Sequence, residues 1–183
     1  MKKIAILFSG GGSNFEYIAK NLHNKKLEIS VALTNNPNAK GIDIAKKYNI
    51  PLVIIPSKEL ERKEFDTKVV NALKEYNFDL AVLAGFMRIL TPVFTRNINA
   101  INLHPSLLPR HKGLNAIERS FEDEFKEGGV SVHFVTSELD SGEIIVQKKI
   151  NKTSLNFNEY YNKIREIEKE ALSEAILKVL EIK

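Results

Sequence analysis

The 183-residue chain contains no cysteine and no tryptophan, and only two methionines, nine glycines and six prolines. The absence of cysteine excludes disulfides, thiolate metal ligands and cysteine nucleophiles, and it is compatible with a reducing compartment. Any chemistry must therefore use other side chains. No segment is polar or repetitive enough to indicate disorder, so we expect the whole chain to fold.

The sequence also lacks a long hydrophobic run. No stretch of about 18 apolar residues exists, so no transmembrane helix is predicted. The apolar run from Ile4 to Phe8 follows a basic start but is too short for a signal peptide, and it continues directly into glycines. We therefore expect a cytoplasmic protein without a membrane partner.

Charge of one sign is in small excess, because 27 Lys and Arg residues against 23 Asp and Glu residues give a net charge of +4. Basic and acidic residues alternate along the predicted helices, which is typical of a solvated surface rather than a nucleic-acid interface. A modest positive field also suits phosphates and polyglutamylated cofactors, and the composition alone leaves these options open. The length favours a single domain over residues 1–183, as a monomer or homodimer.

Hydrophobic periodicity predicts strands that alternate with helices. The expected strands are Lys3–Phe8, Ile29–Leu33, Leu52–Ile55, Leu80–Ala84, Ala100–Leu103, Gly129–Thr136 and Glu143–Lys149, and the expected helices are Asn14–Leu22, Gly41–Tyr48, Lys63–Tyr76 and Asn158–Leu180. The repeated strand and helix units predict an α/β fold with a doubly wound, mostly parallel sheet and a Rossmann-like N-terminal half. The last two strands are expected to form a hairpin or a closely paired edge.

A glycine-rich loop, Ser9 to Asn14, lies between the first predicted strand and helix. Glycines let the backbone approach an anion, and a helix N-terminus offers free N–H groups and partial positive charge, so a phosphate fits this place. The loop has neither the P-loop lysine nor the dinucleotide-binding glycine spacing, which disfavours ATP and NAD. A purely structural alternative is a tight turn in which Ser13 or Asn14 caps the helix.

Asn102 and His104 stand at the end of a predicted strand, in the run Ile101-Asn102-Leu103-His104-Pro105. Side chains alternate along a strand, so both should face the same side until Pro105 ends the strand. An amide and an imidazole together offer an oxyanion donor and a proton carrier, as attack of an amine on a carbonyl requires. A strand-end Asn and His that only satisfy backbone groups remain an alternative.

Asp140 is the third candidate, in a loop after a later strand. Its carboxylate could orient His104 and raise the pKa of that imidazole, and the set would need no metal. The local alternative is a turn aspartate in Leu139-Asp140-Ser141-Gly142. No His-x-x-x-His or His-Glu pairing occurs, so zinc is not expected. His111, in a basic loop, is expected in solvent, and His133 is expected in the core or beside the site.

These motifs resemble folate-dependent formyltransferases. The matching segments are Asn102 to Pro109, Gly129 to Val135 and Leu139 to Gly142, and the segments Gly11 to Asn14 and Ala84 to Leu90 narrow the resemblance to the phosphoribosylglycinamide formyltransferase family. The resemblance covers nearly the whole chain. It implies 10-formyltetrahydrofolate as the formyl donor and the amine of 5'-phosphoribosylglycinamide as the acceptor, in purine biosynthesis, with no metal.

The resemblance also implies roles for individual residues. Asn102, His104 and Asp140 would form the catalytic set, with Asn102 and Asp140 also near the folate. The substrate's phosphate and ribose would be bound by Gly11, Gly12, Ser13, Asn14, Arg165 and Glu168, and the folate by Arg62, Arg88, Ile89 and Leu90. From helical periodicity alone, Arg165 and Glu168 would instead be exposed helix charges, and Arg62 a solvated residue at a helix start.

The sequence departs from the family pattern at a few places. Lys169 stands where a histidine is usual, Arg110-His111-Lys112-Gly113 replaces an aromatic-Pro-Gly turn, and the chain ends soon after the last helix. Two related enzymes stay as alternatives: formyltetrahydrofolate deformylase and methionyl-tRNA formyltransferase, for whose additional domains we expect no room. A phosphometabolite-binding module without catalysis is a third, and it would leave Asn102, His104 and Asp140 without a shared purpose.

Overall fold

The computed structural model describes all 183 residues. The chain forms two compact units. Unit 1 comprises Met1–Ile101 with Ile182, and unit 2 comprises Asn102–Glu181 with Lys183. One domain over the whole chain stays a prediction.

Unit 1 is built from alternating strands and helices. In chain order they are β1 (Lys3–Phe8), α1 (Ser13–Asn21), β2 (Glu28–Thr34), α2 (Gly41–Lys47), β3 (Leu52–Ile54), α3 (Arg62–Lys74), β4 (Leu80–Leu83), α4 (Pro92–Thr95) and the start of β5 (Ala100–His104). β1 pairs in parallel with β2 and with β4, and β2 pairs in parallel with β3. The parallel pairing predicted from the continuous apolar strands is confirmed.

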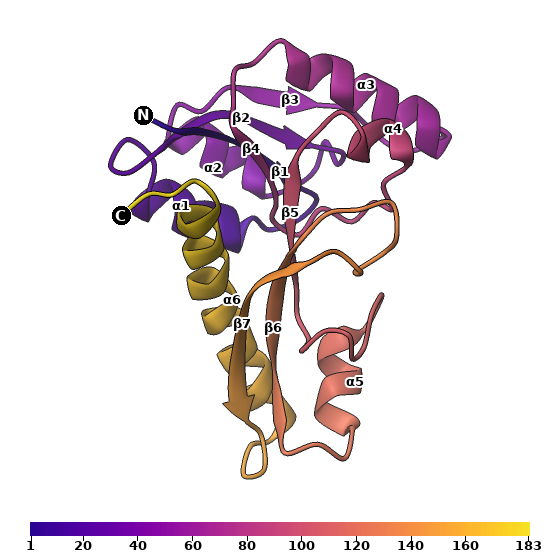
Figure 1. Ribbon diagram of the computed structural model, residues 1–183. Coiled ribbons are helices and arrows are strands. Elements are labelled where there is room, and N and C mark those ends of the chain that lie inside the picture. Colours follow the sequence, from indigo (N-terminus) through magenta and orange to yellow (C-terminus); the bar gives the residue numbers. More distant parts are fainter. The chain divides into compact units, whose positions relative to one another are not determined.

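The strand order of unit 1 explains why its central strands are apolar on both faces. The chain runs from β1 outward to β2 and β3, then returns to β4 on the other side of β1. Right-handed crossovers therefore place α1 and α2 on one face of the sheet and α3 on the opposite face, as Figure 1 shows. Every residue of β4 is buried, as is every residue of β1 after Lys3. This double covering requires near-continuous hydrophobic strands.

Unit 2 contains the end of β5, α5 (Ala116–Glu122), β6 (Glu127–Phe134), β7 (Ile144–Asn151) and α6 (Phe157–Val179). β6 and β7 pair antiparallel, which confirms the predicted edge. α6 packs against both strands (Figure 1). Its first turn is fixed by a capping box, in which Asn156 and Glu159 each accept a backbone N–H of the other at 2.9 Å.

The sheet has seven strands in the order β3-β2-β1-β4-β5-β6-β7; the pairs among β1 to β4 are parallel, and β6 and β7 are antiparallel. The predicted α/β class with a mostly parallel sheet is thus confirmed. The sequence reading missed α4 and α5, which have four and seven residues and are too short to display helical periodicity clearly. No helix combines the length and apolar character that crossing a membrane would require.

Candidate functional site

The carboxyl end of β5 carries Asn102 and His104 on the same side of the strand, as alternation predicts. β5 ends at His104, immediately before Pro105, which lacks the N–H needed to continue a ladder. The side chain of His104 is only 7% exposed. A polar ring so deeply buried needs a partner, and a polar group lies beside each of its nitrogens.

His104 lies between a backbone carbonyl and a carboxylate. Its Nε2 is 2.8 Å from the carbonyl oxygen of His111, and its Nδ1 is 3.4 Å from Oδ2 of Asp140. A carbonyl only accepts hydrogen bonds, so Nε2 carries a hydrogen and Nδ1 is the nitrogen that gains or loses the proton. The predicted approach of Asp140 to His104 is present in the structure.

Burial lowers the pKa of His104 below its ordinary value of 6.5, although the hydrogen bond to the His111 carbonyl and the charge of Asp140 both raise it. From the sequence, we expected Asp140 to raise the pKa of His104. That effect is real, but it is smaller than the desolvation of the ring. His104 is therefore neutral at neutral pH and accepts a proton only when charge develops next to it.

Asp140 is held by the chain around it. It is buried, adopts a left-handed φ of 49°, and its Oδ2 accepts a hydrogen bond from the Gly113 backbone N–H at 2.9 Å. Burial raises the pKa of Asp140, but hydrogen bonds from His133 and Gly113 and the proximity of His104 outweigh it, so the net pKa is below the ordinary value. The carboxylate is ionised at neutral pH.

His133 connects the other two candidates. It is 2% exposed, and its Nε2 lies 3.3 Å from Nδ2 of Asn102 and 3.6 Å from Oδ1 of Asp140. Its Nδ1 is 2.9 Å from the Phe134 carbonyl and must donate to it. Nε2 therefore faces both the Asn102 amide and the Asp140 carboxylate, and the amide nitrogen of Asn102 carries a second hydrogen that can point to a ligand. The expected position of His133 beside the site agrees with this geometry.

His111 does not lie free in solvent, so that expectation was wrong. Its side chain is 21% exposed, and its Nε2 contacts Oδ2 of Asp123 at 2.6 Å. No local pattern indicated this contact, because Asp123 lies twelve residues further along the chain, after α5. Local charge content predicted exposure, whereas a distant carboxylate determines the position of the ring.

Glu168 also differs from the expectation drawn from periodicity. It is 3% exposed, on the face of α6 that also buries Ile164 and Leu172. The side chain of Arg165 is 41% exposed, and its guanidinium donates to Oε2 of Glu168 at 2.8 Å. Burying a carboxylate costs free energy, so Glu168 is not an ordinary solvated charge on the surface of α6.

The glycine loop of unit 1 leads into α1. The N-cap is Gly12, with a φ of 74°, so neither Ser13 nor Asn14 caps the helix. A methyl group on Gly12 would meet Gly41 Cα and Ile44 Cδ1, both at 2.9 Å, whereas one on Gly10 or Gly11 would meet nothing within 4 Å. Packing inside the protein therefore requires glycine at position 12 but not at positions 10 and 11. At Gly10 and Gly11 there is free space for a ligand to approach the backbone beside a helix N-terminus.

The residues expected to border the folate follow β4 or open α3, all in unit 1. Arg62 is exposed at the start of α3, Ile89 is 47% exposed, and Arg88 and Leu90 are partly buried. The guanidinium carbon of Arg88 lies 4.7 Å from the centre of the Phe65 ring, a cation–π contact. The segment is thus anchored on α3, while the apolar side chains of Met87 and Ile89 are exposed.

The segment that contains Arg88 is also fixed at its end. Oδ2 of the buried Asp66 accepts hydrogen bonds from the backbone N–H of Thr91 at 2.6 Å and from its hydroxyl at 2.7 Å. Thr91 in turn caps α4 by accepting from the N–H of Val93. α3 therefore holds the segment at both Arg88 and Thr91.

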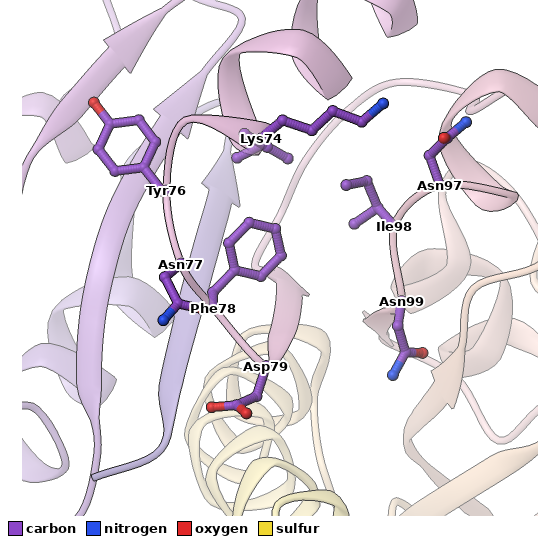
Figure 2. A pocket seen from close by; sticks show the side chains of 9 residues that line it. Lys74, Tyr76, Asn77, Phe78, Asp79, Asn97, Ile98 and Asn99 are labelled. Carbon is purple, nitrogen blue, oxygen red and sulfur yellow. The ribbon is translucent and has the colours of Figure 1, made fainter.

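A hollow of about 290 Å³ lies at the opposite ends of the strands of unit 1. It is formed where the segment 73–79, before β4, faces Asn97 to Asn99, before β5, with the Phe78 ring between the two segments (Figure 2). Asp79, its one acidic residue, already accepts the backbone N–H of Lys3 at 2.8 Å. Open α/β sheets bind ligands at the carboxyl ends of their strands, so this hollow is no candidate site.

Comparison with known proteins matches residues 2–176 to the family described as Formyl transferase. Phosphoribosylglycinamide formyltransferase of Haemophilus influenzae is 39% identical over 155 residues, which cover 82% of this chain and 73% of that protein. The Bacillus subtilis protein of the same name is 37% identical over 82% of this chain and 80% of its own length.

A solved structure supports the same relationship. The crystal structure of phosphoribosylglycinamide formyltransferase from Campylobacter jejuni is 50% identical, with a TM-score of 0.95 over 98% of this chain and 97% of that one. The resemblance stated from the sequence motifs is therefore confirmed, and this chain belongs to the formyl transferase family.

Proposed function

We propose that this protein transfers the formyl group of 10-formyltetrahydrofolate to the amine of 5'-phosphoribosylglycinamide, a step of de novo purine biosynthesis. The observation that carries the proposal is the arrangement of Asn102, His104 and Asp140 at the end of β5, in a chain whose relatives bear the name of this activity. The reaction needs an oxyanion donor and a proton carrier but no covalent nucleophile, and these side chains supply both.

In the proposed reaction the amine nitrogen attacks the formyl carbon, and the carbonyl electron pair moves onto oxygen. An N–H of the Asn102 amide donates to this oxygen, and the contact between that amide nitrogen and Nε2 of His133 orients the amide. The bond between the formyl carbon and the folate nitrogen then breaks, that nitrogen gains a proton, and the amine loses one. His104 Nδ1 carries the proton between them, with Asp140 stabilising the imidazolium that forms.

The remaining site residues keep the roles that the resemblance implies. Gly11, Gly12, Ser13, Asn14, Arg165 and Glu168 bind the substrate's phosphate and ribose, and Arg62, Arg88, Ile89 and Leu90 border the folate together with Asn102 and Asp140. The open backbone at Gly11 supports the first assignment, and the buried carboxylate of Glu168 suits a ribose hydroxyl as partner. No metal, nucleic acid or membrane is needed, and a cytoplasmic monomer or homodimer fits the proposal.

The test measures folate absorbance after purified protein is mixed with 10-formyltetrahydrofolate, with and without phosphoribosylglycinamide. We expect formyl loss only when the amine is present, and its abolition in His104→Asn. The matched control is His23→Asn, which changes a histidine of unit 1 whose Nδ1 accepts from the Ile29 N–H. Formyl loss without the amine would indicate a deformylase, and binding of both ligands without turnover would contradict catalysis altogether.

A further inference from the structure

Lys152 is a buried lysine of unit 2 that the proposed reaction does not use. Its side chain is 6% exposed and follows β7. The ammonium donates to the carbonyl oxygens of Ser120, of Phe121 at 3.2 Å and of Asp123 at 3.1 Å, all at the end of α5. A cation is favoured at a helix C-terminus, because the last carbonyls of a helix have no partner within it.

The same ammonium also binds a carboxylate. Nζ of Lys152 lies 2.6 Å from Oδ1 of Asp123, and the other oxygen, Oδ2, lies 2.6 Å from Nε2 of His111. Hydrogen bonds from Lys152 and His111 outweigh the effect of burial and hold the pKa of Asp123 below its ordinary value. The carboxylate is therefore ionised and can only accept, so His111 Nε2 must donate to it.

The backbone of His111 faces the reacting residues. Its carbonyl accepts the Nε2–H of His104, and two residues further on Gly113 donates its N–H to Asp140. We call residues 110–113 the site loop. His111 has a left-handed φ of 56°, which is uncommon for a residue with a β-carbon. One short loop in an unfavourable conformation therefore holds both His104 and Asp140.

We propose that Lys152, Asp123 and His111 form a bridge that fixes the site loop and thereby positions the imidazole of His104. This inference rests on the proposed function, because it assigns positioning residues to that reaction. The bridge selects the ring nitrogen that carries the hydrogen: with the His111 carbonyl in place, Nε2 donates, and Nδ1 is left facing Asp140 to gain or lose the proton. Of the three bridge residues, His111 lies in the segment Arg110 to Gly113, where this sequence departs from an aromatic-Pro-Gly turn.

Other contacts hold the site loop but do not replace the bridge. Arg119 donates to the carbonyls of Lys112 and Leu114, and the Ser106 hydroxyl donates to the carbonyl of Arg110. Neither contact fixes the carbonyl of His111. The His111 ring faces the Asp123 carboxylate, which Lys152 also contacts and which lies 3.5 Å from the guanidinium of Arg110. The titratable groups that act on the His104 ring are Asp140, His133 and Arg119.

The first test compares His111→Phe with His111→Gln. Phenylalanine keeps the ring but cannot donate to Asp123, whereas the glutamine amide nitrogen can replace Nε2. We expect kcat to fall by about 10- to 100-fold in His111→Phe, because small misplacements of reacting groups cost that much, with KM for both substrates within about twofold of the wild type. His111→Gln should restore most of the activity.

The second test examines His104 directly and does not depend on turnover. In protein with ¹⁵N-labelled histidine, NMR reports which ring nitrogen of His104 carries the hydrogen and at what pH the ring titrates. The wild type should display Nε2–H. In His111→Phe the share of this tautomer should decrease and the pKa of His104 should fall further, because a hydrogen bond that raises it is weakened. A wild type with the expected tautomer but no transferase activity would contradict the proposed function and not the bridge.

Lys152→Met tests the far end of the bridge, with Lys148→Met as the matched control on β7. The ammonium of Lys148 pairs with the exposed Glu174 of α6 at 2.8 Å. We expect the tautomer and kcat of Lys152→Met to change in the same direction as in His111→Phe, and those of Lys148→Met to stay at wild-type values. If Lys152→Met does not fold, the comparison of His111→Phe with His111→Gln still tests the bridge.

The bridge is refuted if His111→Phe lowers the melting temperature while the tautomer, the titration of His104 and kcat all stay at wild-type values. That pattern belongs to a residue with a purely structural role. It is equally refuted if His111→Gln is as impaired as His111→Phe, since the donor atom would then be irrelevant.

Discussion

Nδ1 of His104 lies 3.4 Å from Oδ2 of Asp140, and that oxygen also accepts the Gly113 N–H at 2.9 Å. The carboxylate is thus oriented by the backbone before any ligand arrives. A fixed acceptor stabilises a developing imidazolium without further reorganisation, which is the condition under which electrostatic assistance is strongest. The contact joins residues 36 positions apart in the chain.

Asp140→Asn should lower kcat by at least about 10²-fold, because the protonated form of His104 loses its charged partner while the neutral form is little affected. The pKa of His104 should fall further, since the charge of Asp140 raises it. Steady-state kinetics and an NMR titration of His104 measure the two effects. Glu138→Gln removes a charge from an exposed residue of the same loop and should alter neither. An unchanged kcat in Asp140→Asn would remove Asp140 from the mechanism.

The free energy of unfolding should decrease as the pH falls below about 6.5. Burial lowers the pKa of His104 in the folded protein, so between that value and 6.5 the unfolded chain binds a proton that the folded protein does not. Protonation therefore favours the unfolded chain, and this contribution to stability is fully present only above that window. Urea denaturation at pH values from about 5 to 8 measures the slope. His104→Asn should flatten it, and an equal slope in this variant would assign the effect to other groups.

Gly11→Ala and Gly12→Ala should have different effects, because only Gly12 is required by packing. Gly12 has a positive φ and contacts Gly41 and Ile44, so Gly12→Ala should cost about 1–3 kcal/mol of stability. Gly11→Ala should leave the melting temperature unchanged but raise KM for phosphoribosylglycinamide, because a methyl group would block the approach of a phosphate. Thermal unfolding and kinetics separate the two effects. An unaltered KM in Gly11→Ala would argue against phosphate binding at this loop.

Tyr160→Phe tests a buried hydrogen bond between α6 and α5. The Tyr160 and Ser120 hydroxyls are 2.9 Å apart, and both side chains are almost fully buried. Removing one hydroxyl should cost about 1–3 kcal/mol, since the other is left without this partner in the interior. The double variant Tyr160→Phe/Ser120→Ala should be less destabilised than the sum of the single variants. Urea denaturation of the four proteins measures the coupling, and strict additivity would exclude a net contribution from this hydrogen bond.

The sequence by itself determined the features that depend on neighbouring residues. Strand and helix order followed from hydrophobic periodicity, the side shared by Asn102 and His104 from strand alternation, and the end of β5 from Pro105. The likeness to formyltransferases then followed from several segments that match this family in the same order along the chain. α4 and α5 were missed, because four and seven residues are too few for a periodic signal.

The tertiary structure decided every contact between residues far apart in the chain. The packing of the loops and of α6 against β6 and β7 determines three features of the site. It brings Asp140 close to His104, it buries Glu168, and it places His111 against Asp123. Burial then sets the charge states, as the lowered pKa of His104 illustrates. Local sequence carries the propensity of each segment, whereas desolvation and long-range hydrogen bonds arise only once the segments are packed together.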